Sequence, residues 1–200
     1  MALTNYTDLQ AAIASWMVRS DLTSVIPDFI TLFEATANRR LRVRQQETVG
    51  TITMSSGVGT VPTDYLAWKR MTWPGSTVMQ LEYVHPDWRR AAYPTQPSGV
   101  PKVWTIEGSS IITSPYDTNN TSLNFLYYAK VPALATTNWL MTAHPDLYLF
   151  GSLVEAQAYV LDAEKAVLWK ARRDELFDEI EKLDARTRGP SAPRIMGVVV

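Results

Sequence analysis

The sequence predicts an α+β fold: a helical bundle of N-terminal helices and a C-terminal helical hairpin, with an inserted antiparallel β-rich domain and an extended C-terminal tail. Apolar residues recur at helical spacing near both ends of the chain, and short β-rich runs separated by turn residues fill the middle. We therefore expect residues 1–45 and 135–188 to form the bundle, residues 46–134 the β-rich domain, and residues 189–200 the tail.

Two helices are expected at the N-terminal end. The first begins at Thr7, because Thr7-Asp8-Leu9-Gln10 matches a capping box with Thr7 as N-cap. The second begins near Pro27, since proline suits the first helical turn. Its predicted apolar side consists of Phe29, Ile30, Phe33, Ala37 and Leu41. It finishes in Arg39, Arg40, Arg42 and Arg44, whose positive charges suit a helix C-terminus.

The middle of the chain predicts seven strands, bounded by glycine, proline, serine and asparagine turns. They are Thr48–Met54, Gly59–Val61, Lys69–Trp73, Val78–Tyr83, Lys102–Glu107, Ile111–Thr113 and Leu123–Lys130. A single helical turn is expected at His85-Pro86-Asp87-Trp88.

The C-terminal third predicts an antiparallel helical hairpin. Its first helix begins at Pro145, and its second is a charged run over residues 162–188 that stops at Gly189-Pro190. The apolar stripe predicted for the second helix consists of Trp169, Leu176, Ile180 and Leu183. The opposite charges expected to pair at i,i+4 spacing are Lys170–Asp174, Asp178–Lys182 and Asp184–Arg188.

The composition excludes several classes of function. Cysteine is absent, which removes thiol catalysis, thiolate metal sites and disulfides, and the net charge of −1 gives no global attraction to nucleic acid or anionic membranes. No nucleophile motif or phosphate-binding glycine loop occurs, and both histidines, His85 and His144, open His-Pro-Asp helix starts. We therefore expect no enzyme activity, no cofactor, no metal and no membrane partner.

The arginine cluster Arg39, Arg40, Arg42 and Arg44 has two interpretations. The first is complementation of the helix dipole together with salt bridges across a subunit interface. The second is contact with a phosphate backbone. Seven tryptophans and nine tyrosines also favour an assembled protein, because these residues are enriched at interfaces.

The tail predicts a binding partner. Arg194 precedes a β-prone apolar end, formed by Ile195, Met196, Val198, Val199 and Val200. Burying each apolar side chain contributes ~1.5–3 kcal/mol, whereas ordering the backbone costs ~1–2 kcal/mol per residue. The two terms roughly cancel for one tail. Strand addition to a partner's sheet, or many tails binding together, would tip the balance towards binding.

Several runs of the sequence resemble the head-to-tail adaptor proteins of tailed phages. These runs are residues 21–44, 61–66, 81–84, 127–134 and 144–151, and the resemblance continues into the charged final helix. Their order and spacing, rather than a single motif, carry the resemblance.

The resemblance implies a structural virion protein, assembled in the host cytoplasm. Such adaptors form a ring, usually of twelve copies, that links the portal to the tail or nozzle protein and helps to close the DNA-filled head. By this resemblance Arg194, Ile195, Met196, Val198, Val199 and Val200 would bind the portal protein. The four clustered arginines would lie at a subunit interface, or in the channel beside packaged DNA.

Two alternatives come from other classes of protein. The aromatic-rich middle would also suit a ligand- or carbohydrate-binding β-domain of a phage tail. A hydrolase would need a nucleophile, a base or a metal set that converges on one site, and the sequence predicts none.

Overall fold

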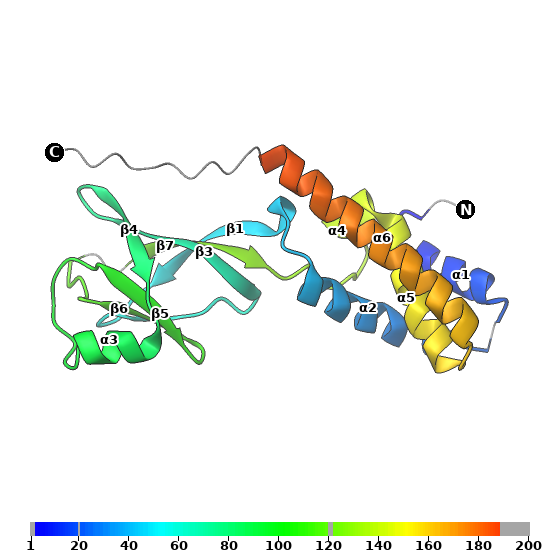
Figure 1. Cartoon of the computed structure of the whole chain (residues 1–200), viewed down its shortest axis with the longest axis horizontal. Coiled ribbons are helices and arrows are strands. Elements are labelled where there is room, and N and C mark those ends of the chain that lie inside the picture. Colours follow the sequence, from blue (N-terminus) through cyan, green and yellow to red (C-terminus); the bar gives the residue numbers. More distant parts are fainter. Residues whose placement is uncertain (1–2, 20, 120–121, 189–200) are drawn as a thin grey trace. The chain divides into compact units, whose positions relative to one another are not determined.

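The computed structural model describes residues 3–19, 21–119 and 122–188, which divide into two compact units (Figure 1). The helical unit contains the described residues up to Gln45 and from Val131 onward. The sheet unit spans Gln46–Lys130. The predicted α+β class is confirmed, because the helices and the strands are segregated in this way.

Five helices build the described part of the helical unit. They are α1 (Tyr6–Met17), α2 (Ile26–Arg40), α4 (Trp139–Ala143), α5 (Pro145–Tyr159) and α6 (Ala163–Arg188). The predicted hairpin of α5 and α6 is present, and α5 also packs against α1 and α2. Gly151 allows the close approach of α2 and α5, since a Cβ atom there would lie 2.0 Å from Cδ2 of Phe33.

Three details of the helical unit differ from the prediction. Asn5, not Thr7, is the N-cap of α1, because Asn5 is extended and its side chain accepts a hydrogen bond of 2.9 Å from the Asp8 N–H. The short helix α4 was not predicted; Asn138 caps it in the same manner, with a bond of 2.8 Å from the Met141 N–H. On α6, Phe177 is buried with Leu176 and Ile180, whereas Leu183 is 56% exposed.

The described residues of the sheet unit form seven strands and the helix α3 (Pro86–Ala92), and each strand overlaps a predicted one. The strands are β1 (Glu47–Thr53), β2 (Val58–Thr60), β3 (Tyr65–Pro74), β4 (Val78–Tyr83), β5 (Val103–Glu107), β6 (Ser110–Ser114) and β7 (Ser122–Ala129). Their order in the sheet is β1-β7-β3-β4-β5-β6-β2.

The sheet is mixed rather than wholly antiparallel. The β4–β5 pair is parallel, with Glu82 opposite Val103 and Tyr83 opposite Trp104. A parallel pair needs a crossover connection, and the segment that contains α3 supplies it. The other pairs along the sheet are antiparallel.

The two outer strands, β1 and β2, approach each other, so that the sheet almost closes into a barrel. A Cβ atom at Gly59 of β2 would lie 2.6 Å from Cγ2 of Ile52 on β1. Aromatic rings fill the interior, where Trp104 packs edge-on against Phe125 and Phe125 stacks on Tyr127. Within the described residues, no helix has the length and apolar character required to cross a membrane.

Candidate functional site

The four arginines of the cluster make different contacts. Arg40, at the end of α2, meets three carboxylates on α6: Nη1 lies 3.3 Å from Asp174 Oδ1, Nε lies 3.3 Å from Glu181 Oε1, and Nη2 pairs with Asp178. Its guanidinium also lies 4.7 Å from the centre of the Phe177 ring. Arg40 therefore joins α2 to α6 within one chain.

Beyond Arg40, Arg42 bonds back to the end of α2, and the backbone of Arg44 bonds to α6. The Arg42 Nη1 donates a bond of 2.8 Å to the Asn38 carbonyl. The backbone N–H of Arg44 donates to Asp184, which also pairs with Arg188 at 2.5 Å. Of the three predicted i,i+4 pairs on α6, only Asp184–Arg188 is present among the described residues.

Arg39 and Arg44 present exposed guanidinium groups. Arg39 donates a bond of 2.9 Å to the Thr36 hydroxyl, and neither guanidinium forms an ion pair with any residue that the structure describes. These two cations are therefore available to another molecule. The location of the cluster at a subunit interface or a channel stays a prediction.

A buried polar network, missed from the sequence, fixes the chain where it returns to the helical unit. Glu34 Oε1 on α2 accepts bonds of 2.7 Å from the Leu134 N–H and 3.1 Å from the Tyr148 hydroxyl. Asn138 donates to Tyr148 and to the Pro132 carbonyl, both at 2.7 Å. The feature of the sequence that could have predicted this network is the position of Glu34 within the apolar face of α2.

Burial determines the ionisation of this network. It raises the pKa of Glu34, although the hydrogen bonds from Leu134 and Tyr148 oppose that change. It also raises the pKa of the Tyr148 hydroxyl. A buried carboxyl group is often catalytic, but here its contacts are structural, because each joins the 131–138 segment or α5 to α2.

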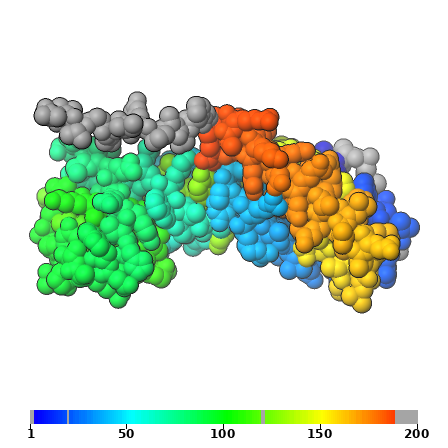
Figure 2. Space-filling view, in the orientation of Figure 1, coloured from blue at the N-terminus to red at the C-terminus, as the bar shows by residue number. Residues whose placement is uncertain are grey.

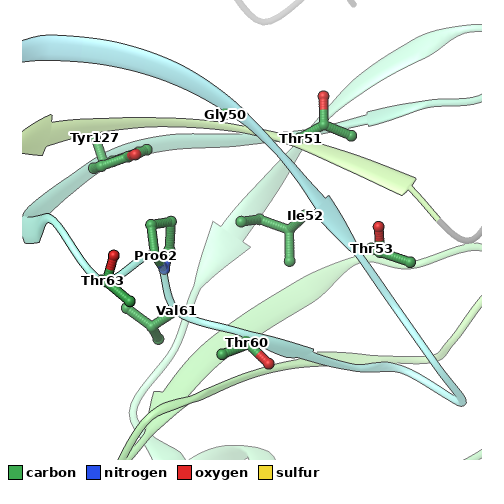
Figure 3. A pocket seen from close by; sticks show the side chains of 9 residues that line it. All are labelled: Gly50, Thr51, Ile52, Thr53, Thr60, Val61, Pro62, Thr63 and Tyr127. Atoms are coloured by element: carbon green, nitrogen blue, oxygen red, sulfur yellow. The ribbon is translucent and has the colours of Figure 1, made fainter.

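A hollow of about 470 Å³ opens between β1 and the chain that follows β2 (Figure 3). Its walls consist of Gly50, Thr51, Ile52, Thr53, Thr60, Val61, Pro62, Thr63 and Tyr127. None of these side chains carries a charge. Burial and the bond to Asp64 raise the pKa of Tyr127 to about 12. The hollow therefore offers no ionised base or activated nucleophile at neutral pH among the side chains that line it.

The two His-Pro-Asp runs begin helices, as predicted. Nδ1 of His85 accepts a bond of 3.3 Å from the Asp87 N–H at the start of α3. His144 precedes α5, and burial lowers its pKa. The histidines belong to different units, and no group of three or more His, Asp or Glu residues among those described could hold a metal ion.

The expected portal-binding residues Arg194, Ile195, Met196, Val198, Val199 and Val200 lie outside the described residues. The part of the chain that matches a known protein family ends at residue 195. A family model described as SU10 adaptor protein matches residues 4–195 and so covers elements of both units. A search of curated proteins finds no match.

Proposed function

The chain belongs to the SU10 adaptor protein family of phage head-to-tail adaptors, and from this premise we propose that it is a structural virion protein that links the portal to the tail or nozzle. The observation that carries the proposal is the family match over residues 4–195. That match indicates a structural adaptor and no catalytic family. In the assembled particle the protein would help to close the DNA-filled head.

The proposed assembly is a ring, with twelve copies as the working number. The helical unit suits such a role, because Arg40 and the Glu34 network join α2 to α6, to α5 and to the returning chain. Such bracing favours a unit that docks without rearranging. We place Arg39 and Arg44 at the contact between copies, or facing the channel where DNA phosphates pass.

We assign the contact with the portal protein to the C-terminal segment Arg194–Val200. Its apolar, β-prone composition supports the assignment, since strand addition to a partner supplies main-chain hydrogen bonds. Many segments on one ring would bind together, which raises the strength of a contact that is weak for one copy.

The test mixes the full-length chain with the portal of the same phage and weighs the product by mass photometry. We expect portal rings that gain about twelve copies of the chain, and a loss of this gain when Arg194–Val200 is deleted. The thermal midpoint of the truncated chain checks that it remains folded. Normal loading by the truncated chain would refute the assignment of the portal contact.

A further inference from the structure

The sheet leaves two strands with an open edge. β1 and β2 are the two ends of the strand order, so among the described strands neither has a hydrogen-bonded neighbour on its outer side. A turn joins them, where the backbones of Ser55 and Val58 exchange bonds of 2.8 and 3.0 Å. Beyond the turn, residues 50–53 and 60–63 part and border the hollow of about 470 Å³ (Figure 3). We call this space the edge hollow, because it lies along the outer edges of these strands.

The edge of β1 lacks the usual protection against another strand. Sheets protect an open edge with charged residues, proline or a very short strand. Residues 48–53 contain no charge and no proline, and five of these six are threonine, valine or isoleucine. The sixth is Gly50, and glycine in a strand often marks a close approach by another backbone. Apart from the pairing with β7, the backbone of residues 48–53 forms no hydrogen bond with any residue that the structure describes, so this edge can accept a strand.

Helix α6 ends beside the chain that leads into β1. Asp184, in the last turns of α6, accepts a bond of 2.8 Å from the Arg44 N–H and pairs with Arg188, the last residue of the helix. Covalent geometry keeps Glu47, where β1 begins, within roughly 11 Å of Arg44. The end of α6 is exposed and is coloured red in Figure 2. The residues that follow α6 therefore begin at an exposed position, close to the first residue of β1.

Twelve residues follow α6, and they fit the edge in length and composition. At ~3.3–3.6 Å per residue, residues 189–200 reach up to about 40 Å, whereas the seven residues of β1 span about 23 Å. Residues 195–200 carry no charged side chain, and neither does the wall of the edge hollow. Four of these six residues are valine or isoleucine, which favour strands. Residues 189–194 can therefore bridge the distance from α6, and residues 195–200 can line the edge.

We propose that residues 195–200 add as a strand to the open edge of β1 in the same chain. The segment approaches from the first residue of β1, so it runs parallel to β1 and antiparallel to residues 60–63. Its backbone bonds to the edge, and alternate side chains face the apolar wall formed by Ile52 and Val61. The added strand covers an edge that would otherwise promote aggregation.

The covalent connection makes this contact effective for a single chain. A short flexible linker holds its segment at an effective concentration of about millimolar. A contact too weak to join separate molecules therefore forms within one molecule. The docking does not depend on the proposed portal contact. Where both form, the portal must displace the segment, because the same residues cannot pair with two partners at once.

Hydrogen exchange of the isolated chain tests the docking. In the full-length chain, the outward-facing amides of residues 48–53 should exchange at least about tenfold more slowly than in a chain that ends at Arg194, because docking replaces their bonds to water. Val198→Pro should abolish this protection, since proline cannot donate to a strand pair. Val198→Leu is the matched control and should keep the protection. Amides of β4 report whether the sheet unit remains folded in each variant.

Disulfide trapping identifies the source of the segment, since the chain has no native cysteine. Thr51→Cys with Val198→Cys should give a monomer that contains a disulfide, whereas Val78→Cys with Val198→Cys should not. Val78 is a suitable control because it is 68% exposed on β4 and does not line the edge hollow. A disulfide-linked dimer in place of the monomer would assign the segment to a second copy and overturn docking within one chain.

Equal exchange in the full-length and shortened chains, with no disulfide in either cysteine variant, would also overturn the inference. That result would leave the adaptor proposal standing, because portal loading is measured separately by mass photometry. A chain that shows the protection but never loads onto portal rings would overturn the adaptor proposal and leave the docking standing.

Discussion

The contact of Arg40 with α6 gives the most quantitative prediction. Arg40→Met keeps an apolar stem over Phe177 but removes the charge that Asp174, Asp178 and Glu181 share. Side chains in these pairs are 32–52% exposed, so solvent weakens each pair to roughly 0.2–1 kcal/mol. The cation–π contact adds about 0.5–1 kcal/mol.

Removing Arg40 also leaves Asp178 and Glu181, three residues apart on α6, to repel each other, whereas Asp174 keeps its ion pair with Arg173. The summed loss is therefore about 1.3–4.5 kcal/mol in the free energy of unfolding of the helical unit. For a chain of this size the thermal midpoint falls by ~2–4 °C per kcal/mol. The melting curve should be followed by circular dichroism at 222 nm, which reports on helices.

Arg39→Met is the matched control, because Arg39 is next in the chain but exposed and without an ion pair among the described residues. Its effect should stay within about 0.5 kcal/mol. In 1 M salt the Debye length is about 3 Å, so the difference in free energy of unfolding between the two variants should become smaller. Equal free energies of unfolding for the two variants at low salt would refute a stabilising contact between Arg40 and α6.

Three further predictions concern buried groups. The raised pKa of Glu34 favours its protonated form in the folded state, so stability should fall as pH rises from the ordinary value of 4.5 through the raised one; Glu34→Gln should flatten this slope in melts across pH 4–7. Gly151→Ala should lower stability by ~1–3 kcal/mol in urea titrations, because its methyl group would overlap the Phe33 ring. Tyr127→Phe should remove one hydroxyl that ionises near pH 12 from the absorbance titration at 295 nm.

Signals confined to a few neighbouring residues predicted most of the fold. Pro27 and Pro145 located the starts of α2 and α5, and the turn residues between the β-rich runs located the strands. The N-cap predicted for α1 was wrong because Asn5 and Thr7 are both residues that can cap a helix, and only the backbone conformation distinguishes them. The parallel β4–β5 pair was missed because strand direction depends on the crossover, which has no local signature.

Contacts between distant residues explain what the sequence could not show of the site. Local spacing assigned Asp174 to Lys170 and Asp178 to Lys182, but in the structure both carboxylates contact Arg40, more than a hundred residues earlier, and Asp174 also pairs with Arg173. The sequence showed the arginine cluster. It did not show that Arg40 makes contacts within the chain whereas Arg39 and Arg44 expose their guanidinium groups. The resemblance to head-to-tail adaptors is confirmed by the family match.

Weighing the chain with its portal tests the central proposal most directly. Mass photometry of portal rings from the same phage, mixed with increasing amounts of the full-length chain, should show one complex that saturates near twelve added copies. Portal rings whose mass stays constant at all concentrations, while the chain remains separate, would contradict the adaptor role proposed for this chain.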